Sequence, residues 1–205
     1  MPLDRRTASL VRISAVAARP EFRDELYAEV HAIKDNASAS RDEIHEAFLQ
    51  LYLFAGFPAA LEGMRALARI WPDESTDAIT RAEQAAATAG SFLAEGDALY
   101  QRVYKDNAPK VREEMLRLSP ELAAWAVVEG YGKTLSRPGL DSITRELCIV
   151  AILTQLGWDR QLYSHLLGAK NVGATKEAIL EAATIGAHGD PGLLQIAEQL
   201  IQKVV

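Results

Sequence analysis

RPGLDSITRELCIVAILTQLGWDRQLYSHLLGAKNVGATKEAILE, the stretch from Arg137 to Glu181, decides the fold. Its apolar residues recur at helical spacing, and two short breaks interrupt them at residues 157–159 and 171–173. The spacing therefore predicts three consecutive helices. Helices joined by so short a turn pack antiparallel, so residues at similar distances from the turn can face each other.

Helical patterns also cover the sequence on both sides of this stretch. Expected N-terminal helices span 3–18, 21–35, 41–55 and 59–70, and expected later helices span 109–118, 120–131 and 192–203. An alanine-rich segment over 73–96 is expected to form a helical connection. Alternation with a period of two residues, which would indicate strands, does not rise above noise. The sequence therefore predicts an all-α protein.

The composition is that of an ordinary globular protein, since 49% of its 205 residues are hydrophobic and 24% are charged. A net charge of −6 argues against a nucleic-acid partner, which needs a basic face. No apolar run approaches the ~20 residues of a membrane span. Because the N-terminus also lacks a signal-peptide pattern, we expect no membrane association and a cytoplasmic address. The single cysteine, Cys148, rules out an internal disulfide and a dithiol mechanism within one chain.

Several short sequence matches recur in the same order in the two halves of the chain. Leu3-Asp4-x-x-Thr7-x-x-Leu10 matches Leu140-Asp141-x-x-Thr144-x-x-Leu147, Leu26-Tyr27 matches Leu162-Tyr163, and Ile44-x-Glu46-Ala47 matches Ile179-x-Glu181-Ala182. Their colinear order favours a duplicated helical unit. We therefore expect a shortened, degenerate first repeat over 1–75, and a linker helix with a fuller second repeat over 76–205. The two are expected to intertwine in one globular unit.

Glu146 and His165 are the residues best suited to acid–base chemistry. A carboxylate among apolar neighbours, as at Glu146, needs a partner if it is buried. His165 lies on the next predicted helix, within reach of the same turn. A carboxylate that holds one ring nitrogen fixes the imidazole tautomer and leaves the other nitrogen for proton transfer. The alternatives are a purely structural pair or a surface histidine.

Three further residues near this pair are candidate site residues. Arg137 and Arg145 carry the planar donors that suit a substrate carboxylate. Either can instead be an exposed arginine or the partner of a neighbouring carboxylate such as Glu146. Cys148 is a possible redox thiol, with a buried and inert thiol as the alternative. No cluster of histidines and carboxylates has the spacing of metal ligands, so we expect no metal.

A set of motifs along this region carries a family resemblance. The motifs are RPGLD from Arg137 to Asp141, Thr-Arg-Glu-Leu at 144–147, His165, and Gly173-Ala-Thr-Lys-Glu177. Together they resemble the carboxymuconolactone decarboxylase family. The resemblance covers about residues 96–187. The N-terminal segment from Tyr52 to Ala60, YLFAGFPAA, resembles the segment that closes a family domain. The resemblance implies an alkyl hydroperoxidase D-like helical bundle with an internal duplication.

The wider superfamily includes alkyl hydroperoxidase D, whose members use a glutamate, a CxxC pair and a histidine. By position, Glu146 matches that glutamate and His165 matches that histidine. Trp158 and Gln161 stand where the two cysteines would be. The redox pair is therefore absent, and Cys148 occupies a different position. This argues against a peroxidase-type thiol relay.

The resemblance implies cofactor-free decarboxylation of a small unsaturated carboxylated lactone or a related acid, with Glu146 and His165 as the acid–base pair. Loss of carbon dioxide would leave a dienolate, whose oxyanion needs a donor and whose carbanion needs a proton. Arg137 or Arg145 would hold the substrate carboxylate. Two alternatives are a peroxide-linked antioxidant protein that uses Cys148 and a non-catalytic helical binding or scaffold protein.

The first copy departs further from the family pattern. Ser9 replaces the glutamate, and Glu29 or a neighbour replaces the histidine, so a single site per chain belongs to the second copy. Family members are known as helical oligomers of interlocked single-domain subunits. Because a tandem chain would mimic one such dimer, we expect a homotrimer of pseudo-dimers, or a homodimer.

Overall fold

The computed structural model describes residues 1–73 and 91–204, and within these ranges the chain forms helices and turns but no strand. The prediction of an all-α protein is confirmed. Of the described helices, none combines the length and the hydropathy needed to cross a membrane. The expected connection over 73–96 and the expected boundary between 75 and 76 lie largely outside the described residues.

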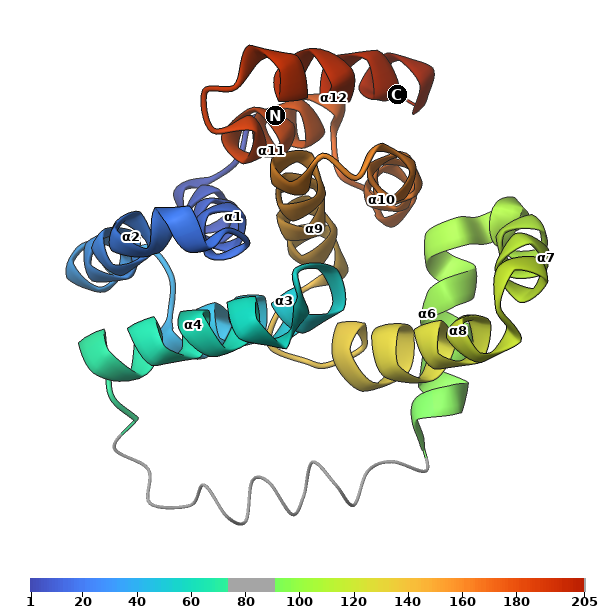
Figure 1. Ribbon diagram of the computed structural model, residues 1–205, viewed down its shortest axis with the longest axis horizontal. Helices are drawn as coiled ribbons and strands as arrows, with labels where there is room; N and C mark the ends of the chain where they lie inside the picture. Colours follow the sequence, from blue (N-terminus) through green and yellow to red (C-terminus); the bar gives the residue numbers. More distant parts are fainter. Residues whose placement is uncertain (74–90, 205) are drawn as a thin grey trace. The chain divides into compact units, whose positions relative to one another are not determined.

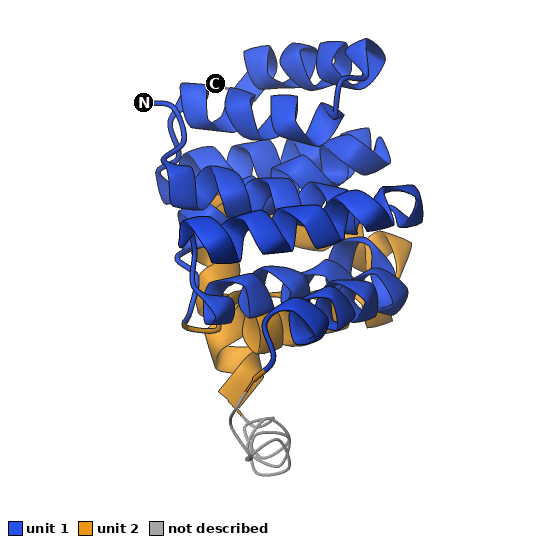
Figure 2. Ribbon diagram, turned by 90° about the vertical axis from the view of Figure 1, so that its left-hand side faces the viewer, with its two compact units in different colours: residues 1–72, 139–205 blue, residues 73–138 orange. Residues whose placement is uncertain are grey.

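The chain divides into two compact units (Figure 2). Unit 1 combines both ends of the chain, Met1–Pro72 and Gly139–Val205, and unit 2 is Asp73–Pro138. Unit 1 contains α1 (Arg5–Ala17), α2 (Arg23–Asn36), α3 (Arg41–Phe54), α4 (Gly56–Ile70), α9 (Ser142–Leu156), α10 (Asp159–Val172), α11 (Lys176–Ala187) and α12 (Pro191–Val204), which Figure 1 labels. A short 3-10 turn, Pro20–Phe22, precedes α2. The three helices predicted for the opening stretch are confirmed as α9, α10 and α11.

Helix α9 is the centre of unit 1, where it contacts α1, α3, α10, α11 and α12 (Figure 1). Every residue from Thr144 to Gln155 is buried, including the charged Arg145 and Glu146, and the run from Leu147 to Leu153 between them and Thr154 is apolar throughout. Its N-terminus is capped by Asp141, whose carboxylate accepts hydrogen bonds from the backbone and the hydroxyl of Thr144. Gly157 ends it in the left-handed conformation at φ 68°, which a residue without Cβ adopts at no steric cost.

The helices of unit 1 fall into two sets with matched spacing. The first set begins at Arg5, Arg23, Arg41 and Gly56, which precede the starts of the second set, Ser142, Asp159, Lys176 and Pro191, by 137, 136, 135 and 135 residues. Four side-chain N-caps also match in pairs, Asp4 with Asp141 and Ser40 with Thr175. The cap at Ser40 is a capping box, in which Ser40 and Glu43 each accept a hydrogen bond from the other's backbone.

Two lysines extend this correspondence to the far ends of the helices. Lys34 of α2 donates to the carbonyl of Ile70 at the end of α4, at 2.8 Å. Lys170 of α10 donates to the carbonyl of Val204 at the end of α12, at 2.7 Å. A cation at a helix C-terminus satisfies a carbonyl that has no intrahelical partner and complements the helix dipole. These matched contacts support the proposal of an internal duplication.

Unit 2 contains α6 (Phe92–Tyr104), a 3-10 turn (Lys105–Asn107), α7 (Ala108–Leu118), α8 (Pro120–Trp125) and a π-helix (Ala126–Leu135). The prediction of one helix over 120–131 is wrong in one respect, because the α-helix ends at Trp125 and a π-helix continues from Ala126. At Gly132 a Cβ would clash with the carbonyl of Phe92, and at Gly96 with the carbonyl of Val127. Close backbone contact between α6 and the π-helix therefore depends on glycine, which helical periodicity does not reveal.

We predict that Asp141→Ala and Asp4→Ala each lower the free energy of unfolding by about 1 kcal/mol, the usual loss for a removed N-cap. Burial raises the pKa of Asp141, but hydrogen bonds from Thr144 outweigh it and hold the pKa below its ordinary value of 3.8. The stabilisation is therefore present above pH 3.8 and is lost as the pH falls further. Urea denaturation at several pH values measures it, with exposed Gln161→Ala as the near-neutral control. Equal stability of Asp141→Ala and the wild type at neutral pH would contradict the assignment.

Candidate functional site

Glu146 and His165 are in direct contact inside unit 1. The Nδ1 atom of His165 lies 2.9 Å from Oε2 of Glu146. Both residues are buried, Glu146 at 3% exposure and His165 at 9%. A carboxylate accepts a hydrogen bond from Nδ1–H, so this contact selects the tautomer with the proton on Nδ1 when the ring is neutral.

The local sequence explains how the two side chains meet. Glu146 lies in the second turn of α9, and His165 lies near the middle of α10. Gly157, in the left-handed conformation, ends α9 and changes the direction of the chain, and α10 packs against α9. Phe54, at the end of α3, presents its ring to the imidazole edge to face, with centroids 5.2 Å apart. The pair is thus held between helices from both ends of the chain.

The other ring nitrogen of His165, Nε2, is the atom available for proton transfer. No described residue supplies a hydrogen-bond partner for it. The His165 side chain retains 11% of its surface exposed, whereas that of Glu146 retains 4%. The arrangement can therefore hold a proton on Nε2 or take one there, while the carboxylate keeps the ring oriented.

Arg145, which directly precedes Glu146 in α9, is bound by other side chains of the protein. Its Nη2 lies 2.8 Å from Oε2 of Glu46, and its Nη1 lies 3.4 Å from Oε1 of Gln50, both on α3. The arginine is 2% exposed and Glu46 is buried as well. The ion pair is thus with Glu46 and not with Glu146. A substrate carboxylate would have to replace Glu46 to bind this guanidinium.

The other two predicted site residues lie in different surroundings. Arg137 belongs to unit 2, where it is half-buried and follows the π-helix. Cys148 is completely buried within α9, and burial raises the pKa of its thiol to about 11. A thiol with so high a pKa has little of the thiolate that reacts with oxidants.

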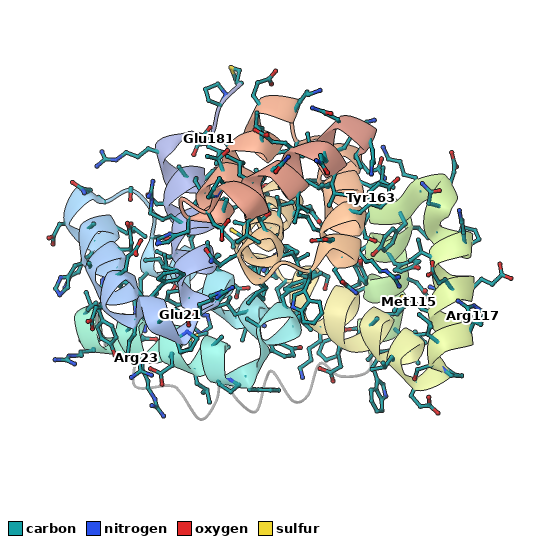
Figure 3. All side chains as sticks on the ribbon, turned by 45° about the horizontal axis from the view of Figure 1, so that its top comes forward. Glu21, Arg23, Met115, Arg117, Tyr163 and Glu181 are labelled. Atoms are coloured by element: carbon teal, nitrogen blue, oxygen red, sulfur yellow. The ribbon has the colours of Figure 1, made fainter. Side chains whose placement is uncertain are left out.

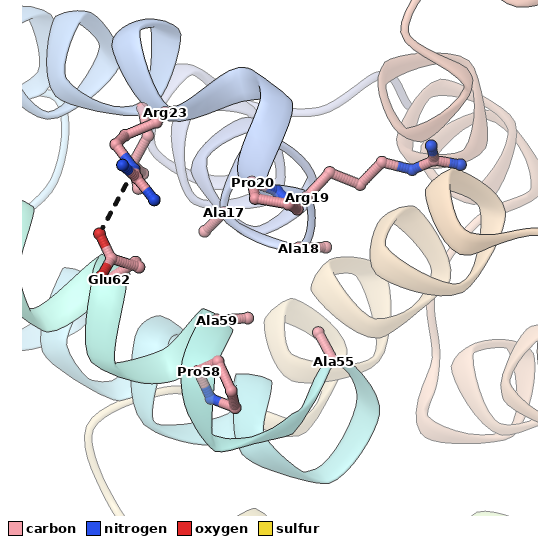
Figure 4. A pocket seen from close by; sticks show the side chains of 10 residues that line it. Ala17, Ala18, Arg19, Pro20, Arg23, Ala55, Pro58, Ala59 and Glu62 are labelled. Carbon is pink, nitrogen blue, oxygen red and sulfur yellow. Dashed lines mark ion pairs between the residues drawn. The ribbon is translucent and has the colours of Figure 1, made fainter.

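A cavity in unit 1 lies apart from this pair (Figure 4). It has a volume of about 260 Å³ and is lined by residues of α1, α2, α4 and their connections, none of which is a predicted site residue. Within the described ranges, no group of three or more histidines, cysteines, aspartates or glutamates is placed to hold a metal ion.

Three residues around the site, Phe54, Glu46 and Gln50, are not predicted as site residues from the sequence. Phe54 was part of the segment thought to close a domain, but helical spacing does not show that its ring reaches His165. Glu46 and Gln50 share a buried face of α3 with Ile44 and Ala47. The sequence signal that could have found Glu46 and Gln50 is their position on an otherwise apolar helix face, because buried polar side chains need polar partners.

The fold and the site define an all-α bundle with a carboxylate–imidazole pair buried between the neighbouring helices α9 and α10. Residues 121–190 match the model of the carboxymuconolactone decarboxylase family. This segment is thus similar to the carboxymuconolactone decarboxylase family, and the match covers about a third of the chain.

Two characterised proteins are similar to parts of this chain. "Peroxisomal protein 2" of Schizosaccharomyces pombe is 30% identical over 144 residues, which is 70% of this chain and 66% of that protein. A "4-carboxymuconolactone decarboxylase" of Acinetobacter baylyi is 41% identical over 51 residues, which is 25% of this chain and 38% of that protein. The chain thus spans less than two thirds of the length of either relative.

The buried pair leads to a prediction about stability. Glu146→Leu removes the carboxylate and leaves a buried imidazole N–H without its partner, which costs about 1–3 kcal/mol. The double variant Glu146→Leu/His165→Leu replaces both groups with apolar ones and should recover part of that loss. Urea denaturation of the wild type, Glu146→Leu, His165→Leu and the double variant should give a coupling energy of about 1–2 kcal/mol. Strictly additive effects would contradict a direct interaction.

The buried thiol leads to a second prediction. Cys148 should not react with a thiol reagent in the folded protein at about pH 8, and should react once urea unfolds the chain. Its pKa rises from 9.0 to about 11 on folding, so the protein favours the neutral thiol. The contribution of the neutral thiol to the free energy of unfolding is complete below pH 9 and declines as the pH rises toward 11. The stability of the Cys148→Ala variant should therefore decline less over this pH range than that of the wild type. Rapid labelling of the folded wild type by the thiol reagent would contradict a buried, inert Cys148.

Proposed function

We propose that this protein catalyses the cofactor-free decarboxylation of a small unsaturated carboxylated lactone or a related acid, with Glu146 and His165 as the acid–base pair. The observation that carries the proposal is the 2.9 Å contact between these two buried side chains. The family segment over 121–190 supports it. The name of the Acinetobacter relative supplies the substrate class.

The proposed reaction follows from what each group can do. The bond between the substrate carbon and its carboxylate breaks, carbon dioxide leaves, and the electron pair moves into the lactone carbonyl as a dienolate. His165 donates the proton on Nε2 to the substrate carbon. Glu146 accepts the hydrogen bond from Nδ1–H and stabilises the positive charge of the imidazolium before that transfer. Water then restores the proton on His165, so the cycle needs no oxidant or metal.

The substrate carboxylate needs a cation, and Arg137 or Arg145 stays proposed for this role. Arg145 already lies 2.8 Å from Glu46 in a buried pair, so binding the substrate through Arg145 would leave a buried carboxylate without its cation.

A non-catalytic binding protein is the second candidate. The observation that favours it is that the pair is buried while the cavity of about 260 Å³ lies elsewhere. A chain that kept the family fold without turnover would still carry this cavity. The thiol-dependent alternative has no comparable support, because Cys148 is fully buried and its pKa is raised.

Assembly and location remain proposals. We propose a homotrimer of pseudo-dimers, or a homodimer, on the basis of the matched helix sets of unit 1. Light scattering after size-exclusion chromatography measures the assembly size. We propose a cytoplasmic address, and a peroxisomal one is the alternative that the name of the Schizosaccharomyces relative supplies.

We predict that the wild type converts carboxymuconolactone with release of carbon dioxide, and that His165→Ala lowers kcat by about 10²-fold or more, the usual contribution of a general acid. Glu146→Gln should have a smaller effect because it keeps a hydrogen-bond acceptor. His31→Ala, an exposed position on α2, is the matched histidine control and should leave turnover unchanged. Carbon dioxide release is the measurement, with circular dichroism to verify folding. A well-folded wild type without turnover would reject this substrate.

A further inference from the structure

The cavity lies where the two connections of the first helix set approach each other. Ala17 and Ala18 at the end of α1 face Ala55, Pro58 and Ala59 at the start of α4 (Figure 4). Alanine and proline leave space because their side chains are short. These five lining residues are apolar, and the ionisable residues that also line the cavity are Arg19, Arg23 and Glu62.

The volume of the cavity sets the size of a ligand. An apolar cavity of roughly 150 Å³ is large enough to hold benzene. At about 260 Å³ this cavity has room for one ring with a short side chain. Ligand pockets typically combine such apolar walls with a few polar groups that orient the ligand.

The polar groups lie at the ends of the cavity. Arg19 extends away toward α9, where its Nε donates to the carbonyl of Gln155 at 3.3 Å (Figure 4). Its Nη1 donates to Glu21 at 3.0 Å. Both contacts are internal to the protein, so Arg19 is committed to holding the α1–α2 connection in place.

Arg23 differs from Arg19 in how it is engaged. Its Nε lies 3.5 Å from Oε2 of Glu62, and among the described residues its guanidinium has no other partner. Its side chain lies at the outer edge of unit 1 and is 58% exposed (Figure 3). Glu62 also accepts a hydrogen bond from Arg65 at 3.0 Å. Glu62 would therefore keep a cation if Arg23 turned to a ligand.

We propose that this cavity is a binding site for a small molecule with an apolar ring or chain and one carboxylate. The apolar part occupies the space between Ala18, Ala55 and Ala59, and the carboxylate takes the fork of Arg23 at the mouth in place of Glu62. A guanidinium binds a carboxylate through two parallel hydrogen bonds, a better fit than the single loose contact to Glu62. The site uses the first helix set and shares no residue with the Glu146–His165 pair.

Alanine-methyl NMR of the full-length protein tests this site, because four alanines line it. We expect phenylacetate to shift the methyl signals of Ala17, Ala18, Ala55 and Ala59 in a saturable manner. Phenylacetamide, its neutral counterpart, should bind about tenfold more weakly because it lacks the charge that Arg23 recognises. The absence of saturable shifts with phenylacetate would overturn the proposal.

Matched variants test the roles of the cavity and of Arg23 in ligand binding separately. Ala59→Phe fills the cavity and should abolish binding, whereas Ala68→Phe, at an exposed position of the same helix, should not. Arg23→Gln should remove the preference for phenylacetate over phenylacetamide, and Arg65→Gln should retain it. Binding that survives Ala59→Phe would refute the cavity as the site, and equal affinity of the wild type for both probes would refute the carboxylate contact.

One more variant separates this site from the proposed reaction. His165→Ala should bind phenylacetate with unchanged affinity, because the cavity contains no residue of the pair. The inference would therefore survive a failure of the decarboxylation assay. Loss of phenylacetate binding in folded His165→Ala would instead refute an independent site.

Discussion

The structure of unit 1 depends on two adjacent and opposite charges in a helix that is buried on every side. Arg145 and Glu146 are neighbours in α9, so their side chains leave the helix about 100° apart. They cannot both turn to solvent, and a buried charge without a partner is very costly. Arg145 finds Glu46 on α3, and Glu146 finds His165 on α10. These two contacts set the positions of α3 and α10 around α9, and α3 in turn brings Phe54 against the imidazole.

The two helix sets of unit 1 share their framework and differ in their chemistry. Spacing, N-caps and lysine contacts at the helix ends correspond between the sets. Under the proposed duplication, the glutamate and histidine of the second set have Ser9 and Glu29, or a neighbour of Glu29, as counterparts in the first. The first set holds the alanine-lined cavity instead. The proposed duplication would allow this division, because helix caps and packing can be retained while one copy changes the residues of its site.

The helical framework was largely predictable, because apolar periodicity and capping residues are local. The start of α9 at Asp141, its end at Gly157 and the capping box at Ser40 could all be read from neighbouring residues. The π-helix was not predictable, since it reflects the close approach of Gly96 and Gly132 to backbone on another helix. For the site, the sequence pointed to Glu146 and His165, but their spacing from the turn allowed contact without requiring it.

What the sequence by itself determined is the all-α class, the helix ends and the identity of one unusual carboxylate and imidazole. These follow from interactions between residues that are close along the chain. The tertiary structure decided which partner each buried charge has, and it placed Glu46, not Glu146, against Arg145. It also buried Cys148 beyond the reach of solvent and left a cavity between α1, α2 and α4. Such outcomes depend on contacts between residues far apart along the chain, such as Glu46 and Arg145, which are separated by 99 positions. Packing of whole helices, which no local pattern encodes, selects among them.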